Sequence, residues 1–357
     1  MADPQEYQRD VSAGLDRVYG DAATEEQVLD VRTARVVVFS DMHKGTRDGA
    51  DDFLRCERAY AAALGSYLER GYRLLVLGDA EELWENRPEG VLAAYDDVLR
   101  LEADFHRAGC YERFWGNHDD EWRYAGQVRK RLGRFFPGLR VREALKVRVR
   151  DGDADLGLLF LVHGHQGTLD SDRLSWLSRL FVRYVWRNVQ RLAHISLNTP
   201  SRDYALAELH DTAMFTWARD HPDRPVLIAG HTHHPIFGTS RPAQAPLRDI
   251  AEIEHDLDAA RRATPADVAR VAALRAELEF VRAEGRRRGP PTIPVVPPCY
   301  FNTGCCCFGD GDVTGLEIAD GEIRLVRWPD DDGRPQPRVL ARADLRDVLR
   351  TVATATR

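Results

Sequence analysis

Five short apolar stretches of this chain end in Asp, His or Asn, residue types whose side chains can bind metal ions. They lead into Asp41-Met42-His43, Gly78-Asp79, Gly116-Asn117-His118-Asp119, His163-Gly164-His165 and Gly230-His231-Thr232-His233. A short apolar run bounded by turn residues is typical of a buried strand. A chain that repeats this pattern is constrained to a sheet with polar residues gathered at its strand ends.

The first three of these stretches alternate with helical patterns. We expect strands at residues 35–40, 73–77 and 111–115, and helices at residues 51–70 and 88–108. Crossovers of this length allow the strands to pair in parallel. The carboxyl ends of parallel strands meet at one edge of a sheet. The pattern therefore predicts an α/β fold with Asp41, His43, Asp79, Asn117 and His118 at a shared edge.

The pattern changes to antiparallel signals after residue 128. Residues 141–149 and 156–162 read as two strands, and Asp151-Gly152-Asp153 between them is a turn signal. Three more short strands are expected at residues 299–307, 312–319 and 322–328, where they would complete a second sheet. The sequence thus predicts a β-hairpin and a second sheet.

Composition limits the class of protein and its partners. The chain has 357 residues, of which 43% are hydrophobic and 30% charged, and its net charge is −7. This acidic balance argues against general coating of nucleic acid, so nucleic acid is not an expected partner. The chain has no apolar run of about 18 residues and no apolar signal core near residue 1. We therefore expect no membrane span and a cytoplasmic location.

The rest of the chain divides around a main domain at residues 31–328. Residues 1–30 are expected to be a helical lead-in and residues 329–357 a C-terminal helical tail. Two helical insertions are expected, a cap at residues 167–220 and a hairpin at residues 248–288. The hairpin is interpreted as a solvated helix pair, with an oligomer contact or a partner-binding arm as alternatives.

Within the cap, arginines recur every four residues, at Arg179, Arg183, Arg187 and Arg191. This spacing places them on one helical stripe. The stripe is interpreted as a solvated face, as an arginine-bearing cover for an anionic substrate, or as a peripheral membrane contact through residues 173–192.

Three of the six cysteines are consecutive, at Cys305, Cys306 and Cys307. Neighbouring residues of a strand point to opposite faces, which suits neither a zinc knuckle nor a disulfide framework. We therefore expect buried, reduced thiols.

Taken together and in order, the five stretches resemble the calcineurin-like metallophosphoesterase superfamily. The resemblance covers residues 35–235 and the strands of residues 299–328. It implies that residues 31–328 form a metallophosphoesterase domain. Its fold would be a four-layer α/β/β/α sandwich of two mixed sheets with helical insertions and a two-metal centre at the strand ends.

The resemblance also implies which residues hold the metal ions. One ion would be held by Asp41, His43, Asp79 and His233, and the other by Asp79, Asn117, His163 and His231. Imidazole, amide and carboxylate ligands suit manganese first, and iron or zinc as alternatives, better than calcium. A carboxylate shared by two divalent ions holds them about 3.5–4 Å apart, and a hydroxide that bridges them can attack phosphorus.

The expected activity is hydrolysis of a phosphodiester, pyrophosphate or phosphomonoester, with a small-molecule substrate. His118 matches a family position that contacts the phosphate and assists the leaving oxygen, and Asp119 would orient its ring. A purely structural hydrogen bond is the alternative role for His118. His165 has no role in the family pattern, and we expect a substrate contact or a contact behind the ligands.

Within the superfamily, the segments from Ser40 to Gly45 and from Gly78 to Trp84 are similar to the UDP-2,3-diacylglucosamine pyrophosphohydrolases. Those enzymes cut a nucleotide-sugar lipid pyrophosphate under a helical cap. That branch usually has Arg at the position of His118 and Asp at the position of His165. Two other functions remain open: an idle scaffold that binds a partner through its arginine-rich helices, and a nuclease with a basic groove at residues 129–142.

Overall fold

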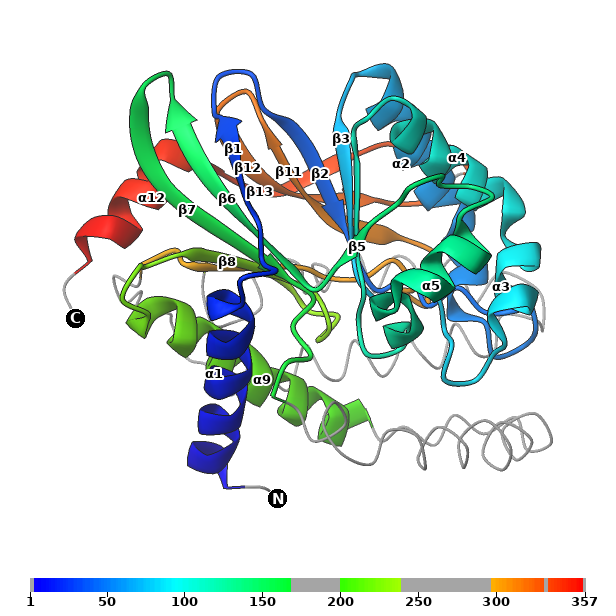
Figure 1. Cartoon of the computed structure of the whole chain (residues 1–357), viewed down its shortest axis with the longest axis horizontal. Helices are drawn as coiled ribbons and strands as arrows, with labels where there is room; N and C mark the ends of the chain where they lie inside the picture. The colour runs from blue at the N-terminus through cyan, green and yellow to red at the C-terminus, as the bar shows by residue number, and fades with distance from the viewer. Residues whose placement is uncertain (1–2, 168–199, 239–296, 331–332, 356–357) are drawn as a thin grey trace, which may run out of the picture.

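Two mixed β-sheets and the helices around them make up the described part of the chain (Figure 1). The computed structural model describes residues 3–167, 200–238, 297–330 and 333–355. The expected α/β class with two mixed sheets is confirmed. Most of the predicted cap, including the arginine stripe and residues 173–192, lies outside the described residues, as does the whole hairpin of residues 248–288.

The larger sheet has seven strands in the order β13-β12-β11-β2-β3-β4-β5. From β2 to β5 the strands are parallel, and β11, β12 and β13 join them as antiparallel neighbours. The bounds are β2 Arg35–Phe39, β3 Arg73–Leu77, β4 Tyr111–Phe114, β5 Val141–Arg142, β11 Val313–Ala319, β12 Glu322–Trp328 and β13 Arg338–Asp344.

The smaller sheet has six strands in the order β1-β6-β7-β8-β10-β9. Strands β6 and β7 form the predicted hairpin, in which Asp151 pairs with Ala154 across a turn at Gly152, whose φ is 62°. The bounds are β1 Glu26–Asp30, β6 Ala144–Asp151, β7 Ala154–Val162, β8 Val226–Ala229, β9 Pro235–Phe237 and β10 Tyr300–Thr303.

Helices follow the strands as the alternating pattern predicts, with breaks near residues 56 and 95. Their bounds are α1 Pro4–Gly20, α2 Glu57–Glu69, α3 Pro88–Ala94, α4 Asp96–Arg107, α5 Ala125–Gln127, α9 Pro200–Asp220 and α12 Leu345–Thr354, with short turns η1 Asp52–Arg55, η2 Asp120–Arg123 and η3 Val128–Leu132. Among the described residues, no helix is both long and apolar enough to cross a bilayer.

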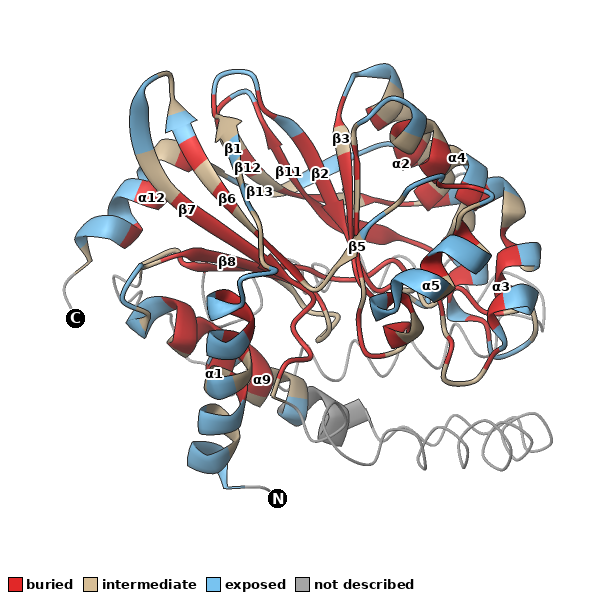
Figure 2. Ribbon diagram, in the orientation of Figure 1, coloured by how far each residue is buried: buried red, intermediate tan, exposed pale blue. Residues whose placement is uncertain are grey.

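Successive side chains of β2 enter two different hydrophobic cores. Val36 and Val38 belong to a core that contains residues of both sheets and of α1, α9 and α12. Val37 and Phe39 belong to a second core with the apolar sides of α2 and α4. The alternation follows from the two-residue period of a strand. The seven-stranded sheet is therefore buried on both faces, as Figure 2 shows along β2 and β3.

Three expectations about the outer parts of the chain need correction. The helical lead-in of residues 1–30 contains α1 but ends in β1, which pairs in parallel with β6. The helical tail of residues 329–357 begins with β13, which pairs with β12. The late strands do not all join one sheet, since β10 lies in the smaller and β11 and β12 in the larger. Strands β1 and β13 form because β6 and β12 offer them backbone partners in the folded protein. Their short polar sequences do not indicate this pairing.

Candidate metal centre

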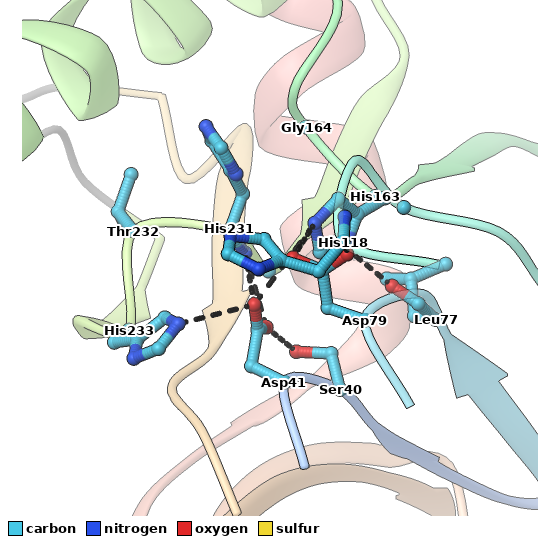
Figure 3. A network of polar contacts seen from close by, with 12 residues as sticks. Ser40, Asp41, Leu77, Asp79, His118, His163, Gly164, His231, Thr232 and His233 are labelled. Carbon is cyan, nitrogen blue, oxygen red and sulfur yellow. Dashed lines mark hydrogen bonds and ion pairs between the residues drawn. The ribbon is translucent and has the colours of Figure 1, made fainter. Parts of the chain in front are cut away.

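The predicted ligands follow strands of both sheets. Asp41, Asp79 and Asn117 lie two or three residues after the ends of β2, β3 and β4, which are parallel neighbours. His163 and His231 come directly after β7 and β8, which are parallel neighbours in the other sheet. Figure 3 shows the side chains of Asp41, Asp79, His163, His231 and His233 around a common centre. The topology therefore brings together residues that are far apart in the sequence.

Asp41, His43 and His233 form the first cluster. Their ligand atoms all lie within 4.8 Å of one another. His233 Nε2 is 3.4 Å from Asp41 Oδ1 and 3.2 Å from His43 Nε2. Two imidazole nitrogens and a carboxylate oxygen thus lie close enough together to hold a metal ion.

Asp79, His163 and His231 form the second cluster, again with ligand atoms within 4.8 Å of one another. His163 Nε2 is 3.0 Å from Asp79 Oδ2. The same oxygen is 3.8 Å from His43 Nε2 in the first cluster. Asp79 therefore lies between the two clusters, at the position predicted for a shared ligand.

Asn117 lies beside the second cluster. The next residue, His118, donates its backbone N–H to Asp79 Oδ1 at 2.8 Å. Asn117 Oδ1 is buried and has no hydrogen-bond partner within the described residues. A buried amide oxygen without a partner is costly. A cation at this place would satisfy it.

His163 is held with one nitrogen free for a ligand role. Its Nδ1 lies 2.8 Å from the carbonyl oxygen of Leu77. A carbonyl only accepts, so Nδ1 donates to it, and Nε2 is the ring nitrogen that faces Asp79 and could bind a cation once it has lost its proton. Burial opposes the charged ring, but Asp79 and Asp41 raise the pKa of His163 to about 9. This concentration of negative charge suits a cation.

The ligands also have unusual backbone conformations. Within the described residues, eight non-glycine residues have a positive φ, and five of them are Asp41, His43, Asp79, His231 and His233, with φ from 50° to 70°. L-residues adopt this region at a cost. Such residues gather at functional sites. Their coincidence with the predicted ligands is a second indication of the site that does not depend on the side-chain distances.

Two glycines permit the close approach of these segments. A Cβ at Gly116 would lie 2.8 Å from Asp79 Cγ, and a Cβ at Gly230 would lie 2.5 Å from Asp41 Oδ2. Both distances are shorter than ordinary contacts, so a side chain would push the acid out of place. The glycines that precede Asn117 and His231 are therefore part of the construction of the site.

His118 lies at the edge of the centre. Its ring packs edge-on against His43, with centroids 4.6 Å apart, and stacks on Trp84 at 4.2 Å. Its Nδ1 is 2.6 Å from Glu82 Oε2, and its side chain is 26% exposed. Burial opposes the charged ring, but Glu82 and Asp79 raise the pKa of His118 to about 9.

Asp119 does not take the role predicted for it. Its carboxylate accepts the backbone N–H groups of Ala80 at 2.9 Å and Gly116 at 2.7 Å. Burial and the nearby carboxylates of Asp79 and Glu81 raise its pKa to about 7. Asp119 thus connects the turns that follow β3 and β4. It turns toward the backbone because two N–H donors lie beneath it.

Glu82 is the residue that holds the His118 ring, and sequence reasoning did not single it out. The same oxygen also lies 3.2 Å from His43 Nδ1, which turns His43 Nε2 toward the centre. Burial alone would raise the pKa of Glu82, but the charge and hydrogen bond of His118 lower it to about 2. In the sequence, the only indication of this role is that Glu82 lies three residues after the predicted ligand Asp79.

A second residue missed from the sequence is Asp211 on α9, which is fully buried. It accepts hydrogen bonds from Thr232 Oγ1 at 2.8 Å, His234 Nδ1 at 3.0 Å and Tyr300 OH at 2.9 Å. These contacts hold the loop that carries His231 and His233. Helix α9 therefore positions two predicted ligands that lie outside it.

His165 is buried but belongs to neither cluster. Its ring centroid is 5.4 Å from that of His163 and 4.9 Å from that of Trp115. Burial and the neighbouring His163 lower its pKa to about 3. It packs behind His163, which is one of the two places expected for it.

The donor set consists of carboxylate, imidazole and amide groups, which fits intermediate divalent cations. The two clusters, the orphaned Asn117 oxygen and the strained ligand backbones agree on the same location. No protein-family model matches the chain, and no curated protein matches it. The function is therefore argued from this arrangement of residues.

Proposed function

We propose that this protein is a two-metal phosphoesterase of the calcineurin-like metallophosphoesterase superfamily. The observation that carries the proposal is the pair of donor clusters that meet at Asp79. Each cluster has two imidazole nitrogens and a carboxylate oxygen, and Asn117 adds an amide oxygen to the second. Manganese suits this set first, with iron and zinc as alternatives.

The arrangement of layers supports the same proposal. One core joins the two sheets, and helices α2 and α4 pack on the outer face of the seven-stranded sheet. Helices α1 and α9 pack on each other, and α9 packs on β8 and β10 of the six-stranded sheet. We interpret this as the four-layer α/β/β/α sandwich of the superfamily, with the centre at the carboxyl ends of the parallel strands.

Divalent cations, when bound at this centre, supply positive charge to the phosphoryl oxygens and lower the pKa of a water nucleophile. The residues of the chain set the geometry. Glu82 holds His43 and His118 through one oxygen, and Trp84 supports the His118 ring. With Nδ1 held by Glu82, His118 presents Nε2, from which it donates a proton to the leaving oxygen.

The substrate class in this proposal is a phosphodiester, a pyrophosphate or a phosphomonoester of a small molecule. A nuclease is disfavoured by the pairing of the basic run of residues 129–142. Arg131 pairs with Glu89, Arg134 with Asp96, and Arg140 and Arg142 with Glu25. Most of that positive charge is neutralised within the protein, so it offers little attraction to a phosphate backbone.

The test is phosphoesterase activity together with metal content. Protein stripped with a chelator and reloaded with Mn²⁺ is assayed on bis(p-nitrophenyl) phosphate, p-nitrophenyl phosphate and a nucleotide-sugar pyrophosphate. We expect activity only with the metal, and a loss of at least about a thousandfold in Asp79→Ala, as when a group acting on the reacting atoms is removed. Asp79→Ala also loses bound manganese, measured by elemental analysis.

The matched control is Asp153→Ala, which removes an exposed carboxylate from the β6–β7 turn. It should keep both activity and manganese. Manganese-loaded wild-type protein that hydrolyses none of the three esters would overturn the proposal.

A further inference from the structure

The three consecutive cysteines after β10 do not all face the same way. The backbone bends at Cys306. Cys306 Sγ lies 3.8 Å from the carbonyl oxygen of Thr314 and belongs to the core beneath α2 and α4. Cys305 and Cys307 lie on the other side, toward the metal centre. Because successive side chains point to opposite sides, the first and third thiols lie on the same side.

Cys305 and Cys307 form a compact cluster with His233. The two sulfurs and a ring nitrogen of His233 all lie within 4.8 Å of one another. Cys307 Sγ is 3.7 Å from His233 Nδ1. All six cysteines of the chain are free thiols. The cluster therefore holds two reduced sulfurs within 4.8 Å of each other, beside a predicted ligand.

We propose that Cys305 and Cys307 are a site of reversible oxidation, at which a peroxide closes a disulfide between them. One thiol attacks hydrogen peroxide, breaks its O–O bond and becomes a sulfenic acid with release of water. The second thiol then attacks that sulfur, and a second water leaves. The two thiols are oxidised by two electrons, and the peroxide is reduced.

The site is open to a small oxidant. Cys307 is partly exposed, and the His233 side chain beside it is 40% exposed. Cys305 is 2% exposed, so we expect the peroxide to react first with Cys307 and the Cys305 thiol to attack the oxidised Cys307 sulfur. Cys56 and Cys299 are buried elsewhere, and Cys110, which is partly exposed, donates its thiol to the carbonyl oxygen of Phe105 at 3.4 Å. These differences favour the pair over the other cysteines.

The disulfide acts on the metal centre through His233, and this step rests on the proposed function. His233 turns Nδ1 toward Cys307 and Nε2 toward Asp41 and His43. Disulfide closure brings the sulfurs to about 2.0 Å from each other, which withdraws Cys307 from the ring. The backbone N–H of Cys306, which donates to the Asp41 carbonyl at 3.1 Å, lies between the two sulfurs along the chain. Oxidation therefore loosens the first cluster and weakens its hold on a cation.

The experiment exposes the reduced, full-length protein to limiting hydrogen peroxide. Thiols are then counted after denaturation, and disulfides are mapped by mass spectrometry of tryptic peptides. We expect two of the six thiols to disappear. The peptide that contains Cys305 and Cys307 should become about 2 Da lighter, and a dithiol reductant should reverse the change. Cys307→Ser should abolish the loss, whereas Cys306→Ser, the matched control, should retain it.

Retention of all six thiols at peroxide concentrations that oxidise free cysteine, or disulfide closure to Cys306 instead, would overturn the assignment. Manganese content of the oxidised protein is measured separately, and we expect it to fall at least tenfold and to recover on reduction. If the disulfide forms and manganese stays bound, the coupling to the metal centre is wrong while the phosphoesterase proposal stands. If the reduced protein binds no manganese, the proposed function fails. The thiol assignment is then decided by the number of thiols lost on peroxide treatment.

Discussion

Asp41, His43, Asp79, His231 and His233 combine a predicted role as metal ligands with an unfavourable backbone conformation. A left-handed conformation costs an L-residue about 1–2 kcal/mol relative to glycine, and Asp and His tolerate it better than most side chains. The folded protein keeps these conformations because hydrogen bonds such as His231 N–H to Asp41 Oδ2, at 3.0 Å, hold the loops in place. The centre is thus built at the expense of stability.

This cost predicts an unusual order of stability at His233, whose φ is 60°. Both His233→Gly and His233→Ala remove the imidazole, but only glycine relieves the backbone strain. We expect the metal-free Gly variant to be about 1 kcal/mol more stable than the Ala variant, as measured by urea unfolding. At His118, which is not among the positive-φ residues, the order should reverse. Equal or greater stability of His233→Ala would contradict the argument.

At single positions, the sequence predicted which side chains meet but not every role. Asp41, Asp79 and the histidines were found because each follows a strand, and strand ends are visible as limits of apolar runs. The partners of Asp119 and Glu82 were not found. Glu81 and Glu82 are adjacent and chemically alike, yet one faces buried Arg113 and the other faces the centre. Only the folded path of the loop separates them.

A buried set of charges links helix α4 to the strands beside the centre. Lys44, Glu81, Glu102 and Arg113 are all fully buried. Lys44 Nζ lies 2.8 Å from Glu102 and 3.5 Å from Glu81, and Arg113 pairs with both acids. Tyr111 OH also donates to Glu102, at 2.8 Å. Two positive and two negative groups balance, which makes each one depend on the others.

Removal of one of these four buried charges should destabilise the protein. Glu102→Gln leaves an excess positive charge in a dry interior and should lower the free energy of unfolding by about 3–5 kcal/mol. The double variant Lys44→Met with Glu102→Gln removes one charge of each sign and should recover part of that loss. Urea unfolding of wild type, single and double variants measures both effects.

The control for this experiment is Arg100→Gln on the solvent side of α4, where the Arg100–Asp96 pair is exposed. It should change stability by less than about 0.5 kcal/mol. A double variant as unstable as the sum of its two single variants would show that Lys44 and Glu102 do not act as a balanced pair.

Several elements with strong apolar patterns were predicted within a residue or two. The strand expected at residues 73–77 is β3 Arg73–Leu77, and the hairpin of β6 and β7 has its turn where the Asp-Gly-Asp signal lies. The strand expected at residues 141–149, however, divides into β5 and β6 of different sheets, and the one expected at residues 299–307 is β10, which ends at Thr303. Strands β1 and β13 were missed, because their polar sequences are ordered by pairing with β6 and β12. An edge strand takes its conformation from a partner that the local sequence does not contain.

The two sheets are joined by polar contacts at Glu112 as well as by their shared core. Glu112 on β4 accepts from Arg142 Nε of β5 at 2.7 Å and from Gln27 Nε2 of β1 at 3.1 Å. β1 belongs to the six-stranded sheet and β4 to the seven-stranded sheet. Burial would raise the pKa of Glu112, but the Arg142 and Gln27 hydrogen bonds hold it below its ordinary value. The ionised carboxylate is therefore the form that stabilises the fold.

This linkage predicts a pH-dependent effect of Glu112→Gln. Because the pKa is lowered on folding, the carboxylate stabilises above the ordinary Glu pKa of about 4.3, and the contribution disappears as the pH falls through the folded-state value. We expect the variant to be about 1–3 kcal/mol less stable at pH 7 and close to wild type in the acid range. Urea unfolding across pH measures the difference.

Glu69→Gln, at an exposed position at the end of α2, is the matched control and should change stability little at either pH. A gap between Glu112→Gln and wild type that stays constant with pH would contradict the assigned role of the charge.

Both sheets contribute predicted ligands, since Asp41, Asp79 and Asn117 follow strands of one sheet and His163 and His231 follow strands of the other. Any slippage of one sheet across the other would pull these residues apart. If the proposed function is right, bound cations link the two sheets. Because the ions bind only the folded protein, metal binding then raises the free energy of unfolding. A fragment that contains only one of the sheets would carry some of the predicted ligands but no complete site. Metal binding therefore requires the whole fold.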